Sequence, residues 1–353
     1  MILLIEHAEM LWIKRNDARV KRGSHNAIAL WEVIWKGMER GHLASSFETQ
    51  QSLNALSPFA GFCACASYLP KLPYRASAHT EKVMPQVLLS RRATFSLGRR
   101  LFHPDWNDER NRSAFGRDFG THGANYLVEL SFIGPISPED GMIVNIAELK
   151  PLISNLIAPL DGAFLPETLE HFAQNRPTAE NLALYLWQGF PKHVAGATLA
   201  QLNLTEGRRV SVGKTSFQMT VSRSYEFAAA HRLALPDLDD AGNLDRFGIC
   251  SNRAGHGHNF TLSVGIEGEP NVQTGFIISP TLLDRIVDEE IFPRFDHKHL
   301  NVDCPEFSEI VPTSENLALV IFEILDERLR REGFTLARVG LQETAKNGFE
   351  VLR

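Results

Sequence analysis

The alternation of apolar and polar residues predicts a β-strand at HGHNFTLSVG, residues 256–265. Side chains two positions apart in a strand share a face, so His256 and His258 are expected side by side. Further along, Thr313 follows a proline and is a suitable N-cap for a helix with one apolar face. The residues of that face recur at helical spacing: Leu317, Val320, Ile321, Ile324, Leu325 and Leu329. Asn347-Gly348 then predicts a two-residue hairpin turn.

This pattern belongs to an internal repeat. Three pairs of segments match at a nearly constant offset: PTAENLA 177–183 with PTSENLA 312–318, THGANY 121–126 with GHGHNF 255–260, and GMIV 141–144 with GFII 275–278. A constant offset over such a length indicates two versions of one domain. We therefore predict a first repeat at 85–213 and a second repeat at 215–353. Each repeat is predicted to contain two strands, then two helices, then two further strands.

Residues 1–83 precede both repeats, and the sequence leaves the role of this N-terminal extension open. Cys63 and Cys65 lie in it, but an isolated Cys-x-Cys is weak evidence for a metal site. Met84 comes directly before the opening strand of the first repeat and is an alternative start of the native protein. The extension is therefore not required to be part of the native core.

Composition excludes several classes of protein. The chain has 353 residues, 44% of them hydrophobic, which is sufficient for two packed domains. No apolar stretch reaches the length of a membrane span, so we expect no membrane partner. The net charge of −6 gives no electrostatic reason for a nucleic-acid partner. The four cysteines lack the density of a secreted disulfide scaffold, and we expect a cytoplasmic protein.

The chemistry-bearing residues gather in the second repeat. His231 closes the run FAAAH, and a neighbouring strand can bring it beside His256 and His258. Three imidazoles without a fourth protein ligand are the pattern of a catalytic Zn²⁺ site, which keeps one position open for water or substrate. The alternative is that these are ordinary histidines, because 13 histidines make chance pairs unsurprising.

From Tyr225 to its C-terminus the chain resembles the 6-pyruvoyl-tetrahydropterin synthase and 6-carboxy-tetrahydropterin synthase family. The matching blocks are FAAAHRL 227–233, CSNRAGHGHNF 250–260, GFIIS 275–279, FDHKHLN 295–301, PTSENLA 312–318 and VGLQET 339–344. The resemblance implies an α+β tunnelling fold in each repeat, with an antiparallel four-stranded sheet and two helices on one face. The spacing between Cys250 and His256 looks more like the pyruvoyl-forming branch.

The resemblance also implies roles for individual residues. The substrate would be 7,8-dihydroneopterin triphosphate, and the reaction would eliminate its triphosphate. The implied zinc ligands are His231, His256 and His258, the implied proton-transfer groups are Cys250, Asp296 and His297, and the implied pterin-binding residues are Glu343, Glu315 and Thr313. Arg232 and Lys298 are the nearest basic residues for the triphosphate, without a firm assignment.

Three functions stay open at this point. The first is a zinc-dependent lyase whose product is 6-pyruvoyl- or 6-carboxy-tetrahydropterin, which serve tetrahydrobiopterin and queuosine synthesis respectively. The second is a dihydroneopterin-processing relative in folate synthesis. Such relatives carry a glutamate near the cysteine, and residues 249–255 contain no acid. The third is a non-catalytic protein of an assembly that binds a pterin or purine.

The first repeat lacks most of this chemistry. Arg99 stands in the place of His231, Ala124 in the place of His258, and Gly162 in the place of His297. Gly116 likewise replaces the cysteine. One remaining imidazole, at His122, does not make a zinc site. Either the first repeat is a structural half, or it holds an unrelated ligand with Arg99 as an anion contact.

The resemblance finally implies a homo-oligomer. In the family, three subunits form a barrel and two such rings stack. We expect a trimer of chains that mimics a hexamer, with one ring of second repeats stacked on one ring of first repeats. Such an assembly would also cover exposed sheet edges.

Overall fold

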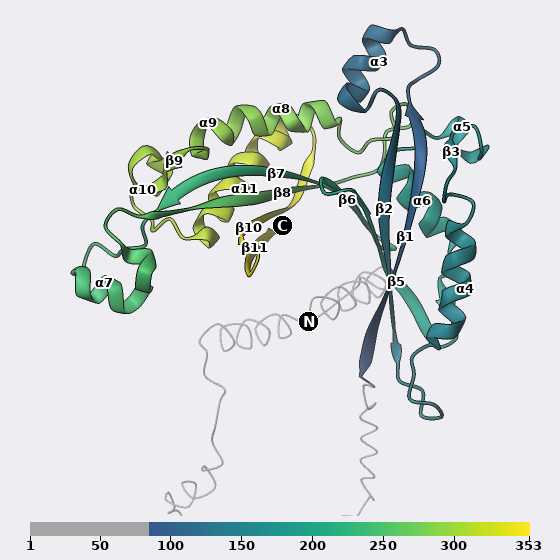
Figure 1. The fold of residues 1–353 in the computed structure, drawn as a ribbon, viewed down its shortest axis with the longest axis horizontal. Coiled ribbons are helices and arrows are strands. Elements are labelled where there is room, and N and C mark those ends of the chain that lie inside the picture. The colour runs from purple at the N-terminus through teal and green to yellow at the C-terminus, as the bar shows by residue number, and fades with distance from the viewer. Residues whose placement is uncertain (1–84) are drawn as a thin grey trace, which may run out of the picture. The chain divides into compact units, whose positions relative to one another are not determined.

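The computed structural model describes residues 85–353, so the expectations for residues 1–83 and Met84 lie outside the described part of the chain. Figure 1 shows long antiparallel strands with helices packed against them. The strands of the first repeat are β1 (Gln86–Leu101), β2 (Gly120–Pro135), β3 (Phe164–Leu165), β4 (His193–Val194), β5 (Ala197–Glu206) and β6 (Val210–Lys214). Its helices are α3 (Asp108–Phe115), α4 (Ile146–Ile157), α5 (His171–Gln174), α6 (Ala179–Gly189) and the 3-10 turn η1 (Gly116–Asp118).

The second repeat follows the same order. Its strands are β7 (Met219–His231), β8 (His256–Glu267), β9 (Lys298–His299), β10 (Thr335–Thr344) and β11 (Asn347–Leu352). Its helices are α7 (Asp240–Phe247), α8 (Pro280–Glu290), α9 (Phe292–Phe295), α10 (Leu300–Asp303), α11 (Ser314–Arg331), and the 3-10 turns η2 (Gly248–Ser251) and η3 (Pro305–Phe307). The structure is therefore of the α+β class, and among the described residues no helix combines the length and apolar character that crossing a membrane requires.

One continuous sheet joins the two repeats. Its strand order is β11-β10-β8-β7-β6-β5-β2-β1-β3, with β4 attached to β5 and β9 attached to β7. β6 and β7 form an antiparallel hairpin in which Lys214 lies opposite Met219. The repeats are thus neighbours in one sheet. Our expectation that each chain places one repeat in each of two stacked rings is wrong for this chain, because the turn at 215–218 is too short to separate the repeats.

Alternating side chains of the strands build the core. In β8, Phe260, Leu262 and Val264 are fully buried, as the period of two predicts. The predicted helix is α11, and Thr313 caps it by accepting a hydrogen bond from the amide of Asn316 at 3.2 Å. Its residues Leu317, Ile321, Leu325 and Leu329 are fully buried and belong to one core cluster that spans both repeats.

The last hairpin corrects a prediction. Its two-residue turn is Ala345-Lys346, and Asn347 already opens β11 opposite Thr344. The hydroxyl of Thr344 accepts hydrogen bonds from the amides of Lys346 and Asn347, both at 3.2 Å, and this closes the turn earlier than the Asn-Gly pair suggests. The register shifts between Gln342 and Thr344, so Glu343 lies in a β-bulge.

Candidate metal centre and its surroundings

Three imidazoles meet at the paired ends of β7 and β8. His231 is the last residue of β7 and lies opposite His256, the first residue of β8, with His258 two positions further along the same face. The Nε2 atoms of His231 and His256 are 3.2 Å apart. One potential ligand atom from each of the three residues lies within 4.8 Å of the others. The sheet register therefore brings the three predicted ligands together.

One hydrogen bond and the burial of the three imidazoles make the cluster suitable for binding a cation. Nδ1 of His231 is 2.8 Å from the carbonyl oxygen of Pro312, which only accepts, so the proton belongs on Nδ1 and the lone pair on Nε2. Burial lowers the pKa of His231 and of His256, which favours the neutral imidazoles that metals bind. In the described part of the chain, Nδ1 of His256 and Nε2 of His258 are buried without a hydrogen-bond partner.

Glu343 faces the same cluster. Its Oε1 lies 3.6 Å from Nε2 of His258 and 3.9 Å from Nε2 of His231. The hydroxyl of Ser314 donates to Oε1 at 2.7 Å, and the side-chain amide of Asn347 donates to Oε2 at 3.3 Å. Burial opposes ionisation, but these donors and the imidazoles outweigh it, and the pKa of Glu343 is lowered. The bulge thus presents an ionised carboxylate beside the three histidines.

The other predicted pterin contacts lie at the start of α11. Thr313 is the N-cap, and its hydroxyl is a hydrogen-bond acceptor for the helix. Glu315 is exposed in the first helical turn. Ser314 and Asn347, which orient Glu343, were not predicted as site residues. The Asn-Gly pair could have drawn attention to Asn347, whereas nothing in the pattern distinguished Ser314 from an ordinary first-turn serine.

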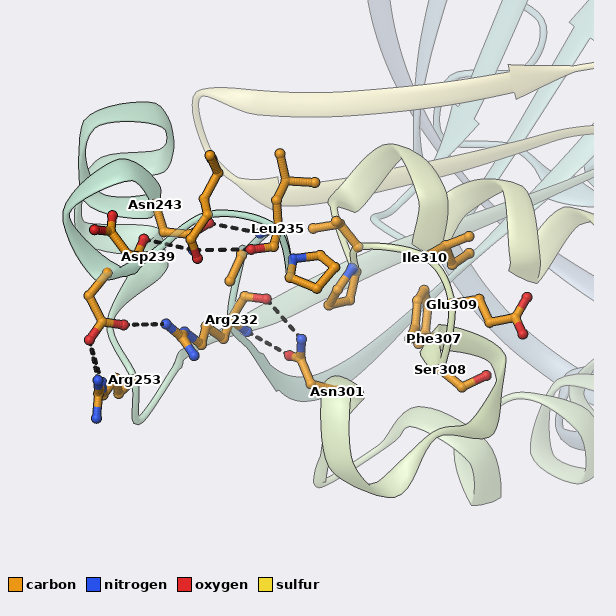
Figure 2. Close-up of a pocket in the computed structure, with 16 residues that line it drawn as sticks. Arg232, Leu235, Asp239, Asn243, Arg253, Asn301, Phe307, Ser308, Glu309 and Ile310 are labelled. Atoms are coloured by element: carbon orange, nitrogen blue, oxygen red, sulfur yellow. Dashed lines mark hydrogen bonds and ion pairs between the residues drawn. The ribbon is translucent and has the colours of Figure 1, made fainter.

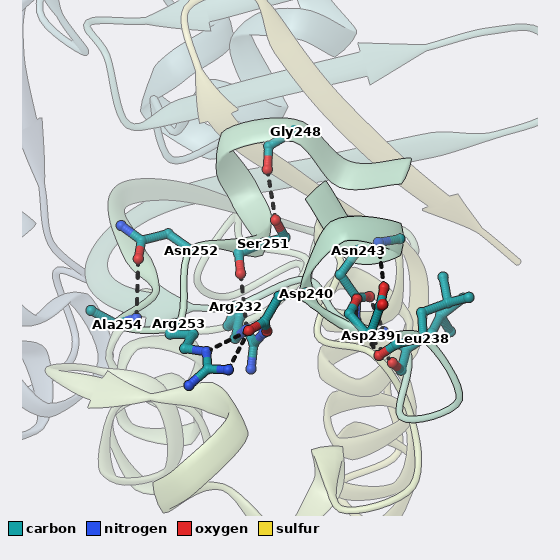
Figure 3. Close-up of polar contacts among 12 residues, drawn as sticks. Arg232, Leu238, Asp239, Asp240, Asn243, Gly248, Ser251, Asn252, Arg253 and Ala254 are labelled. Carbon is teal, nitrogen blue, oxygen red and sulfur yellow. Dashed lines mark hydrogen bonds and ion pairs between the residues drawn. The ribbon is translucent and has the colours of Figure 1, made fainter. Parts of the chain in front are cut away.

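Cys250 is half-buried in η2, after α7. Two bonds tie its segment to the end of β7, because the amide of Leu233 donates to the carbonyl of Cys250 and the guanidinium of Arg232 donates to the carbonyl of Ser251, both at 2.9 Å. Figure 3 shows this loop with Ser251 and Arg232 bound to each other. Among the described residues, no hydrogen bond joins the Cys250 thiol to the three imidazoles.

A groove of about 660 Å³ runs beside the cluster and shares Pro312 with it (Figure 2). Arg232 lines this groove, but Asp240 binds its guanidinium at 3.3 Å and also binds Arg253 (Figure 3). The charge of Arg232 is therefore already paired within the chain. Lys298 does not line this groove; it lies in β9, which pairs with β7, and it lines a separate pocket together with His258 and His297.

Asp296 and His297 form a pair, but away from the cluster. Nδ1 of His297 lies 2.9 Å from Oδ1 of Asp296, and the same oxygen accepts a hydrogen bond from the amide of Ala228. Burial opposes ionisation of Asp296, but the amide and the imidazole outweigh it and lower the pKa. The side chain of His297 is 82% exposed, and no contact in residues 85–353 joins it to Cys250 or the three histidines.

His299 is clearly distinct from His297. It lies against Gly255, where an added Cβ would come within 2.7 Å of its Nε2. His297, by contrast, has a left-handed backbone with φ of 56°. Its counterpart in the first repeat is Gly162, with φ of 74°. The glycine adopts this conformation at no steric cost, whereas the histidine is strained.

In the first repeat, a guanidinium stands in the place of the metal-competent cluster. Arg99 is buried, and it donates to Nε2 of His122 at 2.9 Å, to the hydroxyl of Tyr126 at 2.8 Å and to the carbonyl of Pro177 at 3.1 Å. It also donates to Glu206, the counterpart of Glu343, at 2.5 Å. Burial opposes the charge, but Tyr126 and Glu206 outweigh it and raise the pKa of Arg99. The donors of Arg99 thus bind the protein, which favours a structural first repeat over an anion site.

The fold and the site define an α+β protein whose two repeats share a sheet and whose second repeat carries a three-histidine cluster. The sequence family described as 6-pyruvoyl tetrahydropterin synthase matches the chain twice, at residues 88–213 and at residues 220–353. The chain belongs to this family.

Individual proteins are similar to about a third of the chain. A 6-pyruvoyl tetrahydrobiopterin synthase of Pongo abelii is 40% identical over 130 residues, which is 37% of this chain and 88% of that protein. A putative 6-carboxy-5,6,7,8-tetrahydropterin synthase of Archaeoglobus fulgidus is 32% identical over 136 residues, 38% of this chain and 97% of that protein. The solved structure of Caenorhabditis elegans 6-pyruvoyl tetrahydropterin synthase is 35% identical, covers 38% of this chain and 94% of its own, and has a TM-score of 0.36.

Proposed function

We propose that the chain is a zinc-dependent tetrahydropterin synthase, a lyase that eliminates triphosphate from 7,8-dihydroneopterin triphosphate. The single observation that carries the proposal is the cluster of His231, His256 and His258 with the ionised Glu343 beside it. Membership of the tetrahydropterin synthase family supplies the substrate class.

The residues of the cluster fit a zinc ion. Neutral nitrogen donors suit zinc, and three of them leave a fourth position open, which is typical of catalytic sites. Two of the nitrogens are buried without partners, and a cation would satisfy the one on His258. The Pro312 carbonyl orients His231 as outer-shell partners of metal-bound histidines do. His231, His256 and His258 would hold the ion.

When bound, zinc supplies Lewis-acid stabilisation for negative charge on the side-chain oxygens of the substrate. The remaining chemistry belongs to the chain. The carboxylate of Glu343 accepts hydrogen bonds from the 2-amino group and N3–H of the pterin, and so fixes the ring. The Sγ atom of Cys250 removes a proton from a side-chain carbon, which requires its thiolate form.

Asp296 and His297 supply the second proton-transfer group. The carboxylate lies 2.9 Å from Nδ1 of the imidazole and orients the ring, so the other ring nitrogen can return a proton. Because this pair lies outside the cluster of its own chain, it would act on a site of a neighbouring chain. Thr313 and Glu315 at the start of α11 would complete the wall beside the pterin.

We favour 6-pyruvoyl-tetrahydropterin as the product over 6-carboxy-tetrahydropterin. The relative of Pongo abelii, named for the pyruvoyl product, is 40% identical, whereas the relative named for the carboxy product is 32% identical. The spacing between Cys250 and His256 also favours the pyruvoyl branch. No feature of the described residues favours the folate-related or the non-catalytic function.

The proposal is tested by incubating zinc-loaded protein with 7,8-dihydroneopterin triphosphate and identifying the products by mass spectrometry. We expect released triphosphate and 6-pyruvoyl-tetrahydropterin. A 6-carboxy product would change only the assignment to the pyruvoyl-forming branch and would leave the proposed elimination of triphosphate intact. Unchanged substrate with fully metallated protein would refute the proposed function.

A further inference from the structure

The loop that carries Cys250 has little apolar packing of its own. This cysteine loop, residues 248–255, comprises η2 and the turn that leads into β8. Ile249, its large apolar residue, is 86% exposed, so packing in the core does not fix the loop. The hydroxyl of Ser251 donates to the carbonyl of Gly248 at 2.8 Å, a bond that lies within the loop. The position of the loop relative to the three imidazoles therefore depends on polar contacts with other segments.

Two hydrogen bonds attach the cysteine loop to the end of β7. The amide of Leu233 donates to the carbonyl of Cys250 at 2.9 Å. Nε of Arg232 donates to the carbonyl of Ser251, also at 2.9 Å, as Figure 3 shows. Arg232 and Leu233 directly follow His231 in the chain. The loop is therefore attached immediately next to a predicted zinc ligand.

A carboxylate fixes the guanidinium of Arg232 in this orientation. Oδ1 of Asp240, the first residue of α7, accepts from Nη2 of Arg232 at 3.3 Å. Oδ2 of the same carboxylate accepts from Nε of Arg253, at the far end of the cysteine loop, at 2.8 Å (Figure 3). The side chain of Arg232 is 27% exposed and that of Arg253 is 79% exposed. Because solvent weakens an exposed ion pair more, the contact through Arg232 is the stronger attachment.

The backbone of Arg232 is held as well. Oδ1 of Asn301 accepts from the amide of Arg232 at 2.7 Å, and Nδ2 of Asn301 donates to the carbonyl of Arg232 at 2.9 Å (Figure 2). One side-chain amide thus satisfies both backbone groups just beyond the end of β7, where a strand partner would otherwise do so. Arg232 is therefore fixed at its backbone and at its guanidinium, so it can fix the loop that it binds.

The first repeat, which lacks the cysteine, also lacks this network. Arg100 is the counterpart of Arg232, but its guanidinium lies over the ring of Phe102, 4.2 Å from the centroid. In the described part of the chain it donates no hydrogen bond. Pro166 stands in the place of Asn301 and has no side-chain amide. Both repeats therefore carry the arginine, but the arginine binds the loop only in the repeat whose loop carries a thiol.

We infer that Arg232 is a positioning residue for the proposed proton transfer, because it fixes the loop of Cys250 relative to the three-histidine cluster. A guanidinium suits this role, since its N–H groups point in fixed directions and bind the Ser251 carbonyl and Asp240 at once. The inference rests on the proposed function, in which Cys250 removes a proton. It assigns the charge of Arg232 to contacts within the chain and not to the triphosphate of the substrate.

Proton transfer requires this precision. A base must lie within about 2.6–3.2 Å of the atom that gives up the proton. A misplacement of about 1 Å can lower the rate by on the order of a hundredfold. The proposed pterin contact, Glu343, lies in β10 and is not part of the cysteine loop. Loss of the Arg232 contact should therefore affect the reaction step and leave substrate binding intact.

Steady-state kinetics of the zinc-loaded protein tests this role. Arg232→Met should lower kcat by about tenfold to a hundredfold, with KM and zinc content unchanged. Arg232→Lys should be impaired to the same extent, because an ammonium keeps the charge but lacks the forked donors. Arg100→Met, the counterpart in the first repeat, is the control and should keep wild-type kinetics. A raised KM in Arg232→Met that Arg232→Lys restores would mean that the charge binds substrate, and would overturn the inference.

Alkylation of Cys250 tests the inference without catalysis. Iodoacetamide should modify Cys250 severalfold faster in Arg232→Met and in Asn301→Ala than in the wild type, because a loosened loop exposes the half-buried thiol. The buried Cys304 is the internal reference and should react at one rate in all three proteins. Peptide mass spectrometry measures both thiols.

The two measurements separate this inference from the proposed function. Equal alkylation rates of Cys250 in the wild type, Arg232→Met and Asn301→Ala would overturn the inference even if the wild type is an active lyase. Faster alkylation in the variants of a wild type that does not turn over the substrate would place the failure in the proposed function and not in the attachment of the loop.

Discussion

At the scale of single residues, the two repeats carry different nitrogen groups at equivalent positions of one sheet. The second repeat offers three neutral imidazoles, and Glu343 faces them. The first repeat has the permanently charged Arg99, and Glu206 binds it. A guanidinium that already fills the polar site leaves neither space nor free ligands for a metal. In both repeats a glutamate thus faces a nitrogen-rich group, but only the second repeat leaves nitrogen ligands free for the proposed zinc ion.

This comparison predicts one zinc ion per chain. His258→Ala should lower zinc affinity by more than the roughly 10–100-fold that loss of an outer-shell partner costs, because a direct ligand is removed. The control is His122→Ala, which removes the remaining imidazole of the first repeat and should leave the zinc content unchanged. Metal analysis by mass spectrometry after dialysis measures both. Two tightly bound zinc ions per wild-type chain would contradict the prediction.

Cys250 should be required for turnover but not for metal binding. Cys250→Ala is expected to reduce kcat by at least about 100-fold, the usual contribution of a proton-transfer group. The zinc content and the unfolding temperature should stay at wild-type values. Cys304→Ala is the matched control, because burial raises the pKa of the Cys304 thiol to about 11 and keeps it protonated. Loss of zinc from Cys250→Ala would show that the thiol is a ligand.

At the scale of elements, periodicity predicted the strand at 256–265 and the apolar face of α11, because burial follows the pattern directly. The bulge at Glu343 and the turn at Ala345-Lys346 could not be predicted, since both depend on where Thr344 forms its hydrogen bonds. The three histidines could be predicted from i, i+2 spacing and one strand pairing. The separation of His297 from this cluster could not, because it depends on which edge of β7 pairs with the segment after α9.

That segment supports a further prediction. The left-handed backbone at His297 costs about 1–2 kcal/mol, and the exposed imidazole recovers little of it by packing. His297→Gly should therefore raise the free energy of unfolding by about 1 kcal/mol. It should also abolish activity, because it removes the proposed proton-transfer group. Gly162→His, the reverse change in the first repeat, should lower the free energy of unfolding by a similar amount. Chemical denaturation measures both, and a less stable His297→Gly variant would disprove the argument that strain is retained here for function.

At the scale of the whole molecule, a buried carboxyl group lies where the two repeats meet. Burial raises the pKa of Glu180 to about 7, although the amides of Glu180 and Ile277 partly oppose this. The folded state therefore binds a proton that the unfolded chain, with a pKa near 4.5, has already released. The resulting stability is fully present below pH 4.5 and is lost as the pH rises through about 7. Its size is on the order of 3 kcal/mol.

Glu180→Gln should remove this part of the pH dependence, because the amide stays neutral and can still accept the hydrogen bond from Ile277. Measured by denaturant unfolding between pH 5 and 8, the variant should gain stability relative to the wild type as the pH rises. Glu109→Gln, at an exposed glutamate in α3, should change nothing across this range. If the stability difference between Glu180→Gln and wild type were constant with pH, Glu180 would have the same pKa folded and unfolded. The contact between the repeats would then be independent of its protonation.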